Sequence, residues 1–103
     1  MTNKTLTLLG FASKAGKLGY GFSAALENIN GGKSKLILTA SDLSPKSQKE
    51  VLFHAEKKGV PVLNLQNTDI FSLSNAIGHK CGVVSVNDGN FAKAIKEDFL
   101  NDQ

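Results

Sequence analysis

The chain of 103 residues contains no arginine and no tryptophan, and it has one cysteine, one methionine and two prolines. A single thiol, Cys81, excludes an internal disulfide and argues against a structural zinc site, which needs several Cys and His ligands. Apolar runs do not exceed four residues, which is too short to span a bilayer. Residues 1–4 lead into no signal-peptide core. We therefore expect a cytoplasmic protein that needs no metal, no cofactor and no membrane.

The composition of the chain is typical of one globular domain. Hydrophobic residues make up 41% of the chain and charged residues 20%, which is typical of a folded protein rather than a disordered one. A chain of this length is short for two domains but long enough for one hydrophobic core. We therefore treat residues 1–103 as a single domain, and we expect it to be a monomer.

Positive charge is concentrated in the first third of the chain. All 12 basic residues are lysines, and the net charge of +3 divides into +4 over residues 1–35, +1 over residues 36–80 and −2 over residues 81–103. A basic excess with this asymmetry indicates a polyanionic partner, most often a nucleic acid. A lysine-rich surface without a specific partner explains the same numbers, so charge alone leaves both interpretations open.

Apolar spacing predicts helices that alternate with strands. Ser44 and Asp88 are expected helix N-caps, and the inward faces are expected to include Phe11 in the first helix and Leu52 in the third. The expected helices are residues 4–15, 23–30, 45–58, 69–77 and a last one after Asp88, and the expected strands are residues 18–20, 36–40, 60–65 and 83–86. This alternation predicts an α/β protein, a three-layer α/β/α sandwich around a small mixed sheet of about four strands.

Two glycine motifs resemble nucleotide-binding loops. Residues 19–24, GYGFSA, fit the G-x-G-x-x-A form of a dinucleotide fingerprint, and Asp42 follows at a suitable distance. The apolar run of a central parallel strand does not precede this segment, however. Residues 32–34, GKS, resemble the end of a phosphate-binding loop, but Glu27 stands where that motif needs its first glycine. A dinucleotide-binding enzyme fragment therefore remains a minor alternative.

Three side chains, Cys81, His79 and His54, could in principle support catalysis or metal binding. Cys81 is expected to be a structural residue, and His54 is expected to lie at the surface or at its boundary. No paired carboxylates stand at a helical spacing that defines an acid/base site. We therefore expect a binding protein and not an enzyme, with no catalytic residue.

The sequence resembles one family along nearly its whole length. Residues 12–21, ASKAGKLGYG, match the A-x-K-x-G-K-x-x-x-G opening of the ribosomal-protein superfamily that binds kink-turn RNA, the L-seven-Ae and L-thirty-e type with its small bacterial relatives. Residues 35–45, KLILTASDLSP, are similar to the family's K-L-V-I-I-A-x-D-x-x-P, and the likeness continues through residues 55–62 and 73–78. The resemblance implies an α/β/α sandwich that binds ribosomal RNA or another kink-turn RNA, with the ribosome as a further partner.

The resemblance also assigns an RNA-binding segment. The family carries G-x-N-E-x-x-K at the turn into the second helix, where the Asn and Glu read the sheared G·A pairs of a kink-turn. The corresponding residues 21–27 are GFSAALE. Gly21 is kept and Phe22 fills the open position after it, while Ser23, Ala24 and Glu27 replace the Asn, Glu and Lys. Ser23 can still form a hydrogen bond, but Ala24 cannot.

A second family contact is the loop before the last strand, which packs against an extruded base. It corresponds to residues 79–83, HKCGV, so the resemblance implies that His79 stacks on a base, that Lys80 meets a phosphate and that Cys81 lies within the contact. The lysines expected to engage the phosphates of a bent duplex are Lys14, Lys17, Lys33 and Lys80.

The departures from the family pattern bear on how tightly and how selectively RNA is bound. Without arginine there is no planar fork for bidentate recognition, so we expect low sequence selectivity and strong dependence on salt. Glu27 either repels the RNA backbone and weakens binding, or turns aside and pairs with Lys33 or another lysine. The main alternative is a protein-binding scaffold of the same fold that has lost RNA readout.

Overall fold

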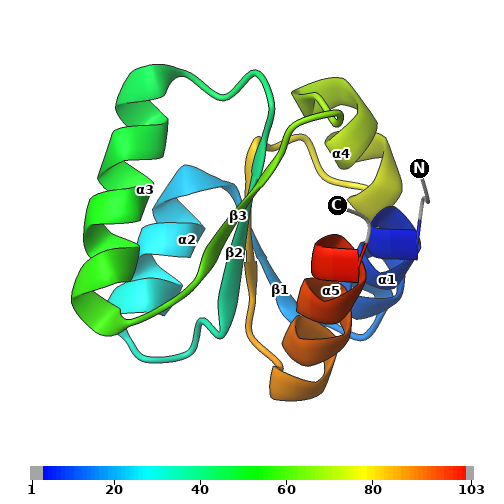
Figure 1. The fold of residues 1–103 in the computed structure, drawn as a ribbon, viewed down its shortest axis with the longest axis horizontal. Coiled ribbons are helices and arrows are strands. Elements are labelled where there is room, and N and C mark those ends of the chain that lie inside the picture. The colour runs from blue at the N-terminus through cyan, green and yellow to red at the C-terminus, as the bar shows by residue number, and fades with distance from the viewer. Residues whose placement is uncertain (1–3, 102–103) are drawn as a thin grey trace.

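The computed structural model describes residues 4–101. Helices and strands alternate along the chain as the apolar spacing predicts (Figure 1). The helices are α1 (Lys4–Lys14), α2 (Gly21–Asn30), α3 (Pro45–Lys58), α4 (Ile70–Ile77) and α5 (Gly89–Asn101), and the strands are β1 (Leu18–Tyr20), β2 (Leu36–Ala40), β3 (Val62–Leu65) and β4 (Val83–Val86).

The four strands form one mixed sheet in the order β1-β4-β2-β3. The strands β2 and β3 are parallel, while β4 is antiparallel to both of its neighbours, β1 and β2. Tyr20 lies opposite Val84 in this register, and Thr39 lies opposite Val83. The last residue of β1, the last residues of β2 and the first residues of β4 therefore meet at one end of the sheet. We call it the Tyr20 end, and it points upward in Figure 1.

The helices cover both faces of the sheet, which confirms the three-layer sandwich. In Figure 1 the helices α2 and α3 lie on one side and α1, α4 and α5 on the other. Alternate strand residues face the two layers because successive side chains point to opposite sides. Ile37 and Val83 pack with α2 and α3, whereas Leu38 and Val84 pack with α1, α4 and α5. Each of these four side chains is at most 1% exposed, and full burial of an aliphatic side chain contributes about 1.5–3 kcal/mol.

The predicted helix caps are present. The hydroxyl of Ser44 accepts a hydrogen bond from a backbone N–H three residues later, and Pro45 occupies the first turn of α3. Gly59 ends the same helix with φ +70°, a left-handed conformation that glycine adopts at little cost. The carboxylate of Asp88 accepts a hydrogen bond of 2.9 Å from the Phe91 backbone N–H at the start of α5.

Six details of the sequence prediction were wrong. Helix α1 ends at Lys14 rather than at residue 15, and α4 begins at Ile70 rather than at residue 69. Helix α2 begins at Gly21, two residues earlier than expected, and β3 begins at Val62 rather than at residue 60. Phe11 and Leu52, which were expected to face inward, are 56% and 37% exposed. Both lie next to apolar residues that are buried. The spacing therefore identified the buried side of each helix correctly but included one neighbouring residue that is exposed.

Candidate functional site

The two segments that the resemblance assigns to RNA meet at the Tyr20 end of the sheet. Tyr20 is the last residue of β1, and His79 lies in the loop between α4 and β4. The two rings are stacked, with their centroids 3.7 Å apart and their planes inclined by 15°. His79 is exposed and Tyr20 is partly buried, so the phenol ring supports one face of the imidazole at the surface.

Hydrogen bonds from α1 hold Tyr20 in this position. The hydroxyl groups of Tyr20 and Ser13 are 2.6 Å apart, and the Ser13 hydroxyl donates to the backbone carbonyl of Ile77 at 2.8 Å. Ile77 is the last residue of α4, two positions before His79. The same contacts therefore fix the tyrosine and the end of the helix that leads into the histidine loop.

The first turn of α2 begins directly beside this stack. Gly21 has φ +91°, a conformation that residues with a Cβ rarely adopt. The N-cap residue, Tyr20, makes no side-chain capping bond, so the first N–H groups of α2 are not satisfied by the residue that precedes them. Such groups, together with the positive end of the helix dipole, favour a phosphate or another anion.

Cys81 helps to hold the loop between α4 and β4 in place. Its backbone N–H donates to the Ser74 hydroxyl at 3.1 Å, and its side chain is 8% exposed. Burial raises the pKa of the Cys81 thiol above its usual value, and hydrogen bonds from the Gly21 and Val83 backbones offset only part of that effect. The thiol is protonated at neutral pH, and it lies under the Gly21 turn as the structural residue that the sequence predicted.

The first two turns of α2 carry the positions at which the sequence departs from the family motif. Ser23 and Glu27 are exposed and stand one turn apart on the same face. Phe22 and Ala24 are partly buried, and Phe22 packs against the core between α2, α3 and the sheet. Within residues 4–101 no ion pair joins Glu27 to Lys33, so Glu27 presents an unpaired carboxylate on this face.

The four candidate lysines fall into two groups. Lys80 lies in the histidine loop, and Lys14 ends α1 next to Ser13, whose hydroxyl is bonded to that of Tyr20. Lys17 precedes β1, where its carbonyl accepts a hydrogen bond of 2.8 Å from the Asn87 backbone, and Lys33 precedes β2. Both of these lie at the opposite end of the sheet, and Lys33 is a whole α2 length, about 15 Å, from Gly21.

The setting of the glycine motif is not that of a dinucleotide fold. The strand before Gly21 is a three-residue edge strand that runs antiparallel to β4, whereas the fingerprint follows a central parallel strand. Gly19 has a packing role, because a Cβ there would overlap the Asn28 amide. The described part of the chain contains no cluster of His, Cys, Asp and Glu able to hold a metal ion.

The family profile of the Ribosomal protein L7Ae/L30e/S12e/Gadd45 family matches residues 3–95 of this sequence. The chain belongs to this family. The match spans every strand and the first four helices, so membership rests on the whole fold and not on one motif. None of the helices within residues 4–101 has the length and apolar character needed to cross a membrane.

Individual relatives agree with the family assignment. The chain is 31% identical to the RNA-binding protein YlxQ of Enterococcus faecium over 94 residues, which cover 91% of this chain and 89% of that protein. It is 28% identical to the large ribosomal subunit protein eL30 of Euphorbia esula, covering 87% and 84% of the two chains. A solved structure of a protein of unknown function from Bacillus halodurans C superposes with a TM-score of 0.87 at 27% identity, covering 93% and 96%.

Sequence analysis missed the residues that hold the site together. Ser13 and Tyr20 lie in different elements, α1 and β1, so neither helical nor strand periodicity relates them. Their hydrogen bond exists because the chain turns back at Gly16, where φ is +72°. Asp42, which was noted for the dinucleotide motif and as the Asp of the family's A-x-D-x-x-P, accepts a hydrogen bond of 2.8 Å from the Ile70 backbone and ties the loop after β2 to the start of α4.

Proposed function

We propose that this protein binds structured RNA, that the RNA is ribosomal or ribosome-associated, and that its preferred shape is a kink-turn or a similarly bent duplex. Family membership supports the RNA and ribosome parts of the proposal, as do the printed names of the relatives, an RNA-binding protein and a ribosomal subunit protein. No catalytic step is part of this function.

The observation that carries the proposal is the stack of His79 on Tyr20 beside the Gly21 turn. The stack joins two segments, far apart in sequence, that the family resemblance assigns to the same RNA. Tyr20 covers one face of the imidazole, and the exposed face is available to an extruded base. Unpaired RNA bases are commonly recognised by such stacking.

The remaining contacts are with the RNA backbone. The N–H groups of Phe22 and Ser23 in the first turn of α2 and the ammonium group of Lys80 would receive phosphates at the Tyr20 end, while Lys14 would meet a phosphate beside α1. Lys17 and Lys33 lie at the other end of the sheet and would meet only RNA that continues past the protein. Ser23 and Ala24 offer little to the base edges, so shape and charge supply most of the recognition.

Binding to three RNAs tests the proposal. A kink-turn, a fully paired duplex of the same length and the kink-turn with its G·A pairs replaced are titrated with the protein at several salt concentrations. We expect the kink-turn to bind more tightly than the straight duplex, with affinity falling steeply as salt rises. Equal binding to the bent and straight RNAs would contradict shape recognition. Binding to none of them would favour the protein-binding scaffold.

A further inference from the structure

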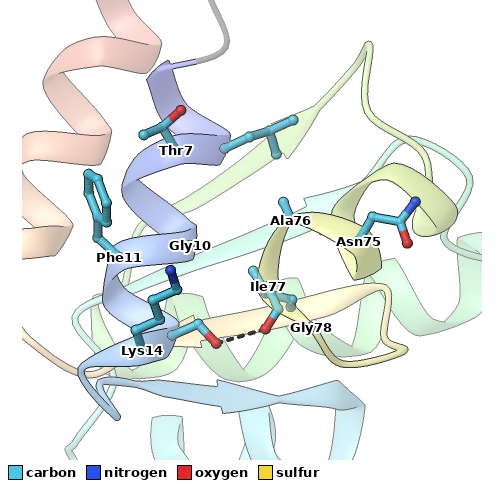
Figure 2. Close-up of a pocket in the computed structure, with 10 residues that line it drawn as sticks. Thr7, Gly10, Phe11, Lys14, Asn75, Ala76, Ile77 and Gly78 are labelled. Atoms are coloured by element: carbon cyan, nitrogen blue, oxygen red, sulfur yellow. Dashed lines mark hydrogen bonds between the residues drawn. The ribbon is translucent and has the colours of Figure 1, made fainter.

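A recess opens between α1 and α4, on the side of α1 that carries Lys14. Its volume is about 630 Å³, within the range of about 300–1,000 Å³ that is typical of small-molecule sites. Figure 2 shows Phe11 and Lys14 on α1 and Asn75 and Ala76 on α4 around this recess. Phe11, Asn75 and Ala76 lie outside the family contacts described above, whereas Lys14 is one of the lysines expected to meet RNA phosphates.

Small residues at the helix crossing create the floor of the recess. A Cβ on Gly10 would lie 3.2 Å from the carbonyl oxygen of Ala76, so glycine permits the close approach of α1 to α4. Lys14 stands one turn after Gly10, and side chains on a helix point back toward its N-terminus. Its stem accordingly runs along α1 toward Gly10 in Figure 2, which brings the ammonium group over the recess.

The lining combines three kinds of chemistry. Phe11 presents an aromatic ring that is 56% exposed, and the exposed Asn75 carries an amide that can both donate and accept hydrogen bonds. Lys14 supplies one positive charge, and no carboxylate is among the described residues that line the recess. An aromatic surface, an amide and one ammonium group match the base, the base edge and the phosphate of a single nucleotide.

The recess is continuous with the proposed RNA surface. It ends at Gly78, the residue before His79, and its wall includes Ser13, whose hydroxyl is bonded to that of Tyr20. A strand that leaves the His79 stack along this side of the protein therefore reaches the recess within one residue of the loop. We propose that the recess binds one unpaired nucleotide that flanks the structured part of the RNA, an inference that rests on the proposed function.

The test compares a kink-turn RNA that has a short single-stranded flank, at its 5′ or its 3′ end, with the same RNA that has none. One flanking nucleotide is 2-aminopurine, whose fluorescence falls when it stacks. Because stacking of a base on an aromatic side chain is worth about 1–3 kcal/mol, we expect one of the flanked RNAs to bind wild-type protein about tenfold more tightly, with quenched fluorescence.

Substitutions assign this gain to the recess. Phe11→Ser and Lys14→Ala should each reduce the gain from the flank. Phe11→Ser should leave the affinity for the unflanked RNA unchanged, because Phe11 lies outside the structured contact. The exposed Lys49 on α3 gives a matched control, and Lys49→Ala should keep the full gain.

The outcomes separate this proposal from the proposed function. Tight binding of the unflanked kink-turn with no gain from either flank would overturn the recess as a nucleotide site while leaving the proposed function intact. A gain that persists in Phe11→Ser and in Lys14→Ala would also overturn it, since the flank would then bind elsewhere. Loss of binding for all of the RNAs would contradict both proposals together.

Discussion

The imidazole of His79 lies flat on the phenol ring of Tyr20, and the hydroxyl of that same tyrosine is bonded to Ser13 on α1. One side chain thus joins the end of β1, the end of α1 and the loop between α4 and β4. The loop is thereby held before any ligand binds, which lowers the entropy that an RNA must overcome when it orders the contact.

The first prediction concerns this stack. His79→Ala should weaken binding of a kink-turn about tenfold, because base–aromatic stacking is worth about 1–3 kcal/mol per base. His79→Phe keeps a flat ring on Tyr20 and should retain most of the affinity. Calorimetric titration measures both variants. Equal affinities of wild type and His79→Ala would show that no base rests on this ring.

The second prediction concerns the two groups of lysines. Each phosphate contact contributes about 0.7–0.9 to the slope of log affinity against log salt. Replacing Lys14 and Lys80 together with alanine should therefore flatten the slope by roughly 1.5 on a short kink-turn. The matched double variant of Lys17 and Lys33 removes the same charge from the other end of the sheet and should change the slope far less. A larger effect of the second pair would move the RNA to that end.

The local features of this fold could be predicted from the sequence, whereas its long-range features could not. The cap at Ser44, the stop at Gly59 and the cap at Asp88 each depend on a few neighbouring residues, so all three could be predicted. The strand order and the antiparallel pairing of β1 could not, because they depend on contacts between distant segments. The Tyr20–His79 stack is a consequence of that pairing, and no local spacing indicates it.

The third prediction concerns Gly21. Its φ of +91° is costly for any other residue, although a Cβ there would meet no described atom within 4 Å beyond the adjoining residues of the chain. Gly21→Val should lower the melting temperature by several degrees, since forcing a β-branched residue into this region costs about 1–3 kcal/mol. It should weaken RNA binding further, because the turn sets the position of the α2 N-terminus.

Gly59 provides the control for that experiment, because its φ is +70° and a Cβ there also meets nothing within 4 Å. Gly59→Val should lower the melting temperature in the same way, while the folded protein keeps its affinity for the kink-turn. If both variants lose stability and both keep affinity, Gly21 serves the fold alone.

The fourth prediction concerns pH. Hydrogen bonds from the Ser72 backbone and side chain lower the pKa of Asp69 from 3.8, so its carboxylate stabilises the folded state when ionised. This contribution is present above the unfolded-state pKa and is lost as the pH falls through the lower, folded-state pKa. Asp69→Asn keeps a capping oxygen but does not titrate. Urea unfolding should therefore show wild type more stable than the variant near neutral pH, with the difference shrinking below a pH of about 4. A difference that is constant down to strong acid would contradict a role for the charge.

The last prediction concerns Glu27, whose carboxylate has no ion-pair partner among residues 4–101 and lies on the exposed face of α2 one turn after Ser23. Two like charges about 4 Å apart repel by about 4 kcal/mol at an effective dielectric constant of 20, before salt screens them. A phosphate near this face therefore binds less tightly than it would beside a neutral side chain. Glu27→Lys should raise affinity for a kink-turn and steepen the salt dependence by about one contact.

Glu50→Lys, on the exposed side of α3, makes the same change of charge away from the Tyr20 end and separates a local effect from one of net charge. Adding Ser23→Asn and Ala24→Glu to Glu27→Lys restores the polar groups of the family motif and should add selectivity for G·A pairs, measured against the G·A-disrupted RNA. Tight, G·A-dependent binding by wild type would show that the three departures cost little. An equal gain from Glu50→Lys would show that Glu27 acts only through net charge, and no gain from any variant would mean that another partner uses this face of α2.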